Sequence, residues 1–211
     1  MKTKKKILVA LALVGCAILL VAGSIAGTLA YLKDETGVVS NTFTTGNVAI
    51  TLDETDVDLY GVKDGEARVM ANQYKLIPGH TYVKDPTIHV TAGSEACYLF
   101  VKVENNLGAL EVAAANGDTI AEQMTTLGWK QIGNGNYWYY NNGAAENAGT
   151  AIDARTEAKD VKVFNNFTVA TDAAIPADAS TLAVNITAYA VQADGFANAM
   201  AAWDATYGAN S

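Results

Sequence analysis

The stretch that decides the fold is residues 96–104, which read ACYLFVKVE. Their odd-numbered positions, from Cys97 to Val103, are all apolar, and this alternation of period two is typical of a β-strand with one buried face. The opposite face begins with Tyr98 and Phe100 before it becomes charged. We therefore expect a second layer of structure to cover part of that face too.

Similar alternation recurs on both sides of this strand. The further strands that it predicts are residues 47–53, 82–91, 129–132, 137–140, 161–164 followed by 167–169 as a pair or one bent strand, and 181–193. Pro86 is expected to interrupt the strand that contains it, because proline cannot donate a hydrogen bond to a strand ladder. Pro78 with Gly79 predicts a tight turn, and residues 133–136 (GNGN) predict a hairpin turn.

Two short helices are also expected. The first covers residues 118–127, with Asp118 as its N-terminal cap. The second covers residues 196–207 and carries a docking stripe formed by Phe196, Met200, Trp203 and Tyr207. Residues 53–65 are predicted to be a polar connection, and residues 141–158, which are rich in small residues, an exposed loop.

These elements predict a mainly β fold in one domain, residues 31–211. The chain has 211 residues, half of them apolar, which suits one domain preceded by an address segment. About eight strands with little helix favour a two-sheet antiparallel sandwich, jelly-roll-like, with one short middle helix and a short C-terminal helix.

The charge of the chain excludes some partners. The whole chain has 14 basic and 22 acidic side chains, and four of the lysines precede Tyr31. From Tyr31 onward, ten basic side chains therefore stand against 22 acidic ones, a net charge of −12. Such a surface repels nucleic acids and anionic lipid, so we expect no nucleic-acid partner and membrane contact only through the address segment before its cleavage.

The first 30 residues have the layout of an export signal. Lysines at positions 4–6 precede an uncharged stretch, residues 7–32, that ends in small residues. We predict cleavage after Ala30, with Thr28 two residues before it, so that the mature chain begins at Tyr31; a cut after Ala26 is the second candidate. The stretch is also long enough for a permanent membrane anchor, and residues 13–16 (LVGC) spell a lipoprotein signal, so both alternatives stay open.

Two groups of motifs carry a resemblance to a known family. Residues 27–34 (GTLAYLKD) and 41–48 (NTFTTGNV) resemble the mature start of exported proteins that a SipW-type signal peptidase processes in Gram-positive bacteria. An ordered set further along is similar to the same proteins: LIPG at 76–79, KD at 84–85, AGS at 92–94, YLFVKV at 98–103 and AYAVQADGF at 188–196. The chain thus resembles the TasA and camelysin family of biofilm-matrix and cell-surface proteins.

The resemblance implies a secreted structural protein of the extracellular matrix or cell surface. Fibres of the family form by donor-strand exchange, in which the N-terminal segment of one subunit enters the sheet of the next. Residues 31–39 are the implied donor, with Tyr31, Leu32, Val38 and Val39 supplying apolar side chains. The implied partners are further copies of the chain, other matrix proteins and the SipW-type signal peptidase, and no cofactor is implied.

A second hypothesis is a non-catalytic adhesin or glycan-binding module. Five aromatic residues in the predicted hairpin supply its recognition surface by stacking on sugars: Trp129, Tyr137, Trp138, Tyr139 and Tyr140. Because alternate residues of such a hairpin more often face the core than the surface, we favour packing over sugar recognition for these rings.

A secreted metallopeptidase is the third hypothesis and the weakest. Some schemes class camelysin as a peptidase, but His80 and His89 are the only histidines and no His-Glu-x-x-His motif occurs. We therefore expect no enzymatic activity, and we interpret the two as a turn histidine and a strand histidine. Cys97, the one cysteine after Tyr31, is expected to be buried and inert.

One acidic stretch partly mimics a calcium loop. Asp56, Asp58 and Gly61 match its first, third and sixth positions, but Ala67 stands where a bidentate glutamate is required. Weak calcium binding by Asp53, Asp56 and Asp58 is the alternative to a solvated acidic loop.

Overall fold

A computed structural model describes residues 47–113, 118–179 and 181–208, all within the second of the two units into which the chain divides, Val38–Ser211. Every structural statement below concerns these residues. The predicted signal, its cleavage site at Thr28, Ala30 and Tyr31, and the predicted donor segment lie outside them.

The described residues form ten strands, two α-helices and one 3₁₀ turn. The strands are β1 (Ile50–Val57), β2 (Lys63–Val69), β3 (Thr81–Val83), β4 (Thr87–Val90), β5 (Cys97–Asn105), β6 (Trp129–Gln131), β7 (Tyr137–Tyr140), β8 (Lys159–Lys162), β9 (Asn166–Thr168) and β10 (Val184–Gln192). The helices are α2 (Ile120–Thr126) and α3 (Ala199–Thr206), and the 3₁₀ turn is η1 (Gly108–Leu110).

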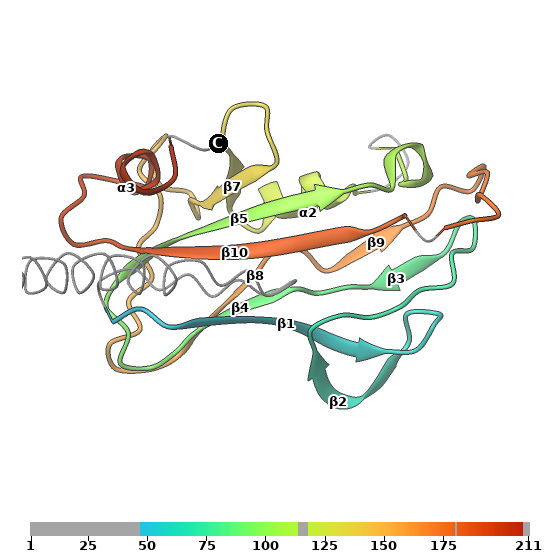
Figure 1. The fold of residues 1–211 in the computed structure, drawn as a ribbon, viewed down its shortest axis with the longest axis horizontal. Helices are drawn as coiled ribbons and strands as arrows, with labels where there is room; N and C mark the ends of the chain where they lie inside the picture. The colour runs from blue at the N-terminus through green and yellow to red at the C-terminus, as the bar shows by residue number, and fades with distance from the viewer. Residues whose placement is uncertain (1–46, 114–117, 180, 209–211) are drawn as a thin grey trace, which may run out of the picture. The chain divides into compact units, whose positions relative to one another are not determined.

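The strands build an antiparallel sandwich, which confirms the mainly β prediction. One sheet has the order β2-β1-β4-β8, a second has the order β10-β5-β7-β6, and β3 pairs with β9. Figure 1 shows β5 and β10 lying over β1 and β4. Pro86 separates β3 from β4, as the sequence predicts.

The core lies between the sheets and follows the period-two pattern. Its inward side chains include Ile50 and Leu52 of β1, Ile88 of β4, and Leu99 and Val101 of β5, all less than a tenth exposed. Because the two long strands β5 and β10 pair along nine residues, they form the spine of their sheet.

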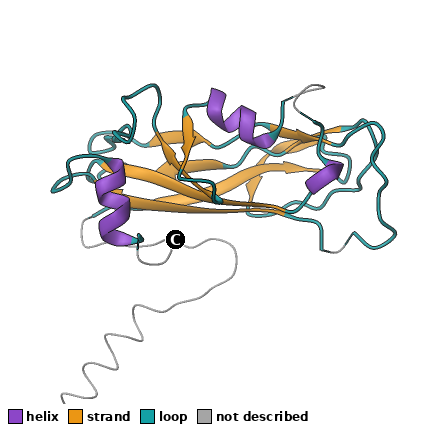
Figure 2. Cartoon of the chain, turned by 90° about the horizontal axis from the view of Figure 1, so that it is seen from above, coloured by secondary structure: helices purple, strands orange, loops and turns teal. Residues whose placement is uncertain are grey.

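A smaller core covers the outer face of β5 and β10, as Phe100 and its neighbours predict. Trp203 of α3 lies 5.0 Å from Phe100, measured between ring centroids, and both are buried. Asn198 caps α3 by accepting a hydrogen bond from the N–H of Ala201 at 2.8 Å, so Phe196 precedes the helix rather than beginning it. Figure 2 shows α3 lying across the strands near one end of the sandwich.

The polar stretch 53–65 is not the simple connection that we expected. β1 continues to Val57 and pairs with β2, and Thr55 stands opposite Arg68. Residues 63–68 of β2 are exposed, so pairing with β1 rather than burial stabilises this strand. For the same reason its sequence has no apolar pattern that predicts a strand. Gly61 closes the hairpin at a φ of 74°, where an added Cβ would lie 2.8 Å from the Cα of Tyr82.

Three smaller predictions are also corrected. Thr119, not Asp118, caps α2, because its hydroxyl accepts from the N–H of Glu122 while the Glu122 carboxylate accepts from the N–H of Thr119. β8 and β9 do not pair with each other but with β4 and β3. The segment 141–158 is not wholly exposed, since Ala154 is buried and Ile152 forms a bridge with Cys97.

Candidate functional site: a groove beside the free edge of β10

β10 is a long edge strand. It pairs with β5 over nine residues, and no other described strand pairs with its second edge. Asn106 donates to the carbonyl of Ala183, so the alternation of an antiparallel ladder aims the N–H and C=O groups of Val184 and Ile186 away from β5. An unpaired strand edge of this kind is a template for adding another strand.

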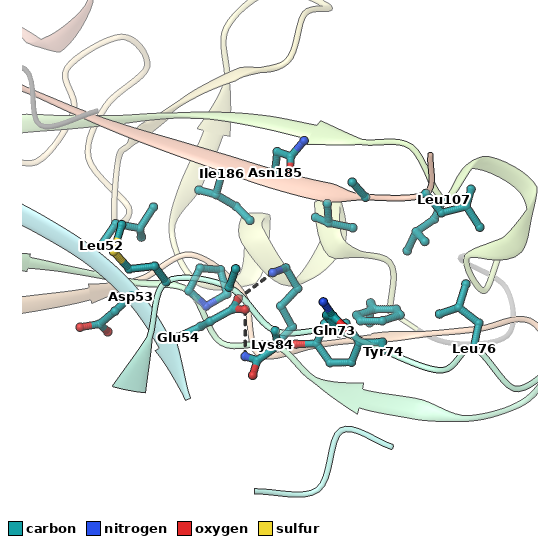
Figure 3. Close-up of a pocket in the computed structure, with 18 of the residues that line it drawn as sticks. Leu52, Asp53, Glu54, Gln73, Tyr74, Leu76, Lys84, Leu107, Asn185 and Ile186 are labelled. Atoms are coloured by element: carbon teal, nitrogen blue, oxygen red, sulfur yellow. Dashed lines mark hydrogen bonds and ion pairs between the residues drawn. The ribbon is translucent and has the colours of Figure 1, made fainter. Parts of the chain in front are cut away.

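An open groove runs beside this edge, between β10 and β1. Its volume is about 480 Å³, and segment 70–76 forms part of its wall. Figure 3 shows Leu52, Tyr74, Leu76, Leu107 and Ile186 among its apolar lining, together with the polar Asp53, Gln73 and Asn185. Further apolar residues that line it are Met70, Pro86, Phe167, Leu182 and Val184. The groove therefore offers apolar contacts next to unpaired backbone groups, the combination that a bound β-strand uses.

A buried ion pair lies within the groove. The Nζ of Lys84 donates to Oε2 of Glu54 at 2.6 Å, and the two side chains are 10% and 4% exposed. Asn72 donates to the other oxygen of Glu54 at 2.9 Å and accepts from the N–H of Val57. Figure 3 shows Glu54 and Lys84 side by side in the groove. Charges are stable at this depth only when paired and hydrogen-bonded, so these three residues form one polar unit within the wall of the groove.

The groove and the start of the described chain lie toward opposite ends of the strands. Asn47 accepts a hydrogen bond from the N–H of Glu95, just before β5 begins. The groove lies beside Val184 and Ile186, which pair with the other end of β5, at Asn105 and Val103. At roughly 3.3 Å per residue, this separates the two points by about 25 Å along the sheet.

A second polar cluster lies on the outer face of the sheet β2-β1-β4-β8. His89 of β4 stands between two carboxylates, with its Nε2 2.9 Å from Asp53 of β1 and its Nδ1 2.7 Å from Asp160 of β8. Arg68 of β2 pairs with Asp53 from the other side. Burial alone would lower the pKa of His89, but the hydrogen bonds and charges of the two carboxylates outweigh it, so the pKa is raised.

This cluster predicts a pH-dependent stability difference. Because the pKa of His89 is raised in the folded protein above its ordinary 6.5, its contribution is complete below pH 6.5 and is lost as pH rises through the folded pKa. We expect His89→Gln to lower the free energy of unfolding by about 1 kcal/mol at pH 5.5 and by less at pH 8.5. Urea unfolding at both pH values measures this, and an equal effect at the two would contradict it.

The three aspartates named for calcium do not gather around one point. Asp53 pairs with Arg68 and His89, and Asp58 accepts from the N–H groups of Tyr60 and Val62 in the β1–β2 turn. Asp56 belongs to β1. Among the residues that the structure describes, no cluster of three or more histidine, cysteine or acidic side chains suits a metal ion.

The histidines have the placements predicted for them. His80 follows the turn at Pro78 and Gly79, and its Nε2 lies 2.8 Å from the carbonyl of Tyr60. His89 lies in β4, which follows Pro86 along the chain, and it contacts Asp53 and Asp160 rather than the partner of His80.

The aromatic hairpin forms as predicted, but it does not present its five rings together at the surface. Trp129, Trp138 and Tyr139 are buried, the first two in the main core and the third beneath α3. Tyr137 packs against Trp203 and Tyr140 against Trp129, and both are partly exposed. These rings therefore act mainly in packing.

Cys97 is buried in the main core, as the sequence predicts, and burial raises the pKa of its thiol to about 12. Because the thiolate is the reactive form, we expect no reaction with a thiol reagent at pH 8 in the native chain that begins at Tyr31, and complete reaction in denaturant. Absorbance after addition of Ellman's reagent measures both rates. Fast labelling of the native protein would contradict the buried placement.

The groove residues escaped the sequence reasoning, although a signal was present. The buried alternation that begins at Val48 continues through Ile50 and Leu52 to Glu54, which places a charged residue in an inward position. A charge at such a position needs a buried partner. Lys84 supplies it from 30 residues away, a pairing that no local pattern encodes.

Comparisons with protein-family models, curated proteins and solved structures give no match for this chain. The family resemblance of the sequence therefore stays a prediction. Within the described residues, no helix has both the length and the apolar character needed to cross a membrane.

Proposed function

We propose that this chain is an exported structural protein of the extracellular matrix or cell surface that assembles into fibres by donor-strand exchange. Residues 31–39 of one copy add to the free edge of β10 in the next copy and place apolar side chains in the groove. One observation carries the proposal: the long second edge of β10, with which no other described strand pairs, lies beside a groove that offers apolar side chains.

The positions of the donor segment and the groove on one subunit favour an open chain of subunits over a closed dimer. The donor segment joins the described domain at Asn47, toward the opposite end of the strands from the groove. A donor leaving one end and an acceptor at the other form a head-to-tail contact, which can repeat from copy to copy and produces an open filament when its rotation does not close a ring.

Removal of the signal peptide is the switch for assembly in this proposal. Cleavage after Ala30 by a SipW-type signal peptidase frees Tyr31 and Leu32 from the membrane-directed segment. The donor strand then becomes available only outside the cell, where the acceptor domain has also folded.

Electron microscopy of negatively stained protein that begins at Tyr31 tests the function directly. We expect ordered filaments whose number grows with protein concentration. Monomers that persist at high concentration would count against assembly and favour the adhesin hypothesis. That alternative would need another binding surface, because Trp129, Trp138 and Tyr139 of the hairpin are buried.

A further inference from the structure

Lys84 has hydrogen-bonding capacity left over inside the groove. Its ammonium carries three N–H donors, and its partner among the described residues is Glu54 at 2.6 Å. The lysine side chain is nine-tenths buried, so bulk water reaches it poorly. Both oxygens of Glu54 already accept a hydrogen bond, one from Lys84 and one from Asn72.

An occupant of the groove is therefore expected to bring an acceptor to Lys84. The surrounding wall is mixed: Leu52 and Ile186 line it toward one side and Leu76 and Leu107 toward the other (Figure 3). The polar residues Asp53, Asn72, Gln73 and Asn185 also line it. The complementary ligand is an extended segment with an acidic side chain between apolar ones, because the N–H donors of Lys84 that Glu54 leaves free make their strongest hydrogen bonds with a carboxylate.

One face of the predicted donor segment has this pattern. In a strand, alternate side chains share a face, so the even positions of residues 31–39 present Leu32, Asp34, Thr36 and Val38. The odd positions present Tyr31, Lys33, Glu35, Gly37 and Val39 instead. Only the even face places a carboxylate between two apolar ends without also bringing a lysine toward Lys84.

We infer that Asp34 of a second copy pairs with Lys84 in the groove and thereby sets the register of the added strand. This inference rests on the proposed function and names the contact that makes it specific. A slip of one residue turns the strand over, so Lys33 faces the ammonium of Lys84 while Leu32 and Val38 face solvent. Apolar contacts alone would fix the register only loosely, and the ion pair between Asp34 and Lys84 selects one register.

A matched pair of substitutions tests the inference in the chain that begins at Tyr31. Asp34→Asn and Glu35→Gln each remove one negative charge from adjacent residues, so they change the net charge equally. We expect Asp34→Asn to raise the critical concentration for filament assembly about tenfold or more, the effect of losing a charged hydrogen bond, and Glu35→Gln to change it less than about twofold.

A double-mutant cycle isolates the contact. In a background with Glu54→Gln and Lys84→Gln the buried charges are gone, so Asp34→Asn is expected to have less than about a twofold effect there. Circular dichroism checks first that this background folds. If it does not, the comparison of Asp34→Asn with Glu35→Gln decides alone.

The outcomes separate the inference from the function on which it rests. Filaments of the unmodified chain together with equal effects of the two single substitutions would overturn the Asp34 contact and leave donor-strand assembly standing. A larger effect of Glu35→Gln would also overturn it, because the odd face would then enter the groove. Absence of filaments from the unmodified chain would instead reject the function itself.

Discussion

Deletion of residues 31–39 from the chain that begins at Tyr31 is expected to leave a folded monomer that no longer forms filaments. In the proposed assembly, the deleted segment supplies the strand that pairs with β10 and the apolar side chains that enter the groove. Burial of one large apolar side chain stabilises a contact by about 1.5 to 3 kcal/mol, so losing two raises the critical concentration for assembly far more than tenfold.

Size-exclusion chromatography and circular dichroism of the truncated protein measure this outcome. A synthetic peptide of residues 31–39, added in trans to the full mature chain, is expected to occupy the acceptor edge and shorten the filaments. Undiminished assembly of the truncated chain would reject donor-strand exchange. Loss of the fold would show that the segment belongs to the sheet of its own subunit.

A substitution on the acceptor side provides a matched control. Val184→Pro removes an N–H that faces the free edge, at the first residue of β10, where a strand tolerates proline. Val184→Ala keeps that N–H and removes more of the apolar side chain. If backbone pairing along β10 drives assembly, Val184→Pro is expected to have a higher critical concentration for filament assembly than Val184→Ala. The two variants are expected to have similar melting temperatures.

The second large effect concerns α3. Replacement of Trp203 by alanine is expected to lower the free energy of unfolding by about 3 to 5 kcal/mol, because large aromatic residues in a core cost this much when truncated. Trp203 is 2% exposed, and its ring centroid lies 5.0 Å from those of Phe100, Tyr137 and Tyr207. For a domain of this size the melting temperature is expected to fall by about 10 °C.

Asp204→Ala is the control, since this neighbouring residue of α3 is exposed and its replacement is expected to change stability by less than about 0.5 kcal/mol. Differential scanning calorimetry compares the two variants. If Trp203→Ala leaves the melting temperature unchanged, α3 does not stabilise the sandwich. Loss of the near-ultraviolet dichroism signal without global unfolding would show that α3 detaches as a separate unit.

The sequence predicted most of the strands because one-sided burial leaves a period of two. β5 shows this best, since its inward positions from Cys97 to Val103 are all buried. Phe100 on the opposite face also predicted the second layer that Trp203 completes. β2 was missed for the converse reason, because its residues 63–68 are exposed and carry no periodic signal.

The sequence by itself determined the fold class and the buried, structural placement of Cys97, because both depend on apolar residues that are close together along the chain. Only the tertiary structure decided where a groove lies, since it brings β1 beside β10 across more than a hundred residues of sequence. It also decided that Glu54 meets Lys84 there and that the hairpin tryptophans face inward. Contacts between distant segments depend on how two sheets stack, and local periodicity does not encode that arrangement.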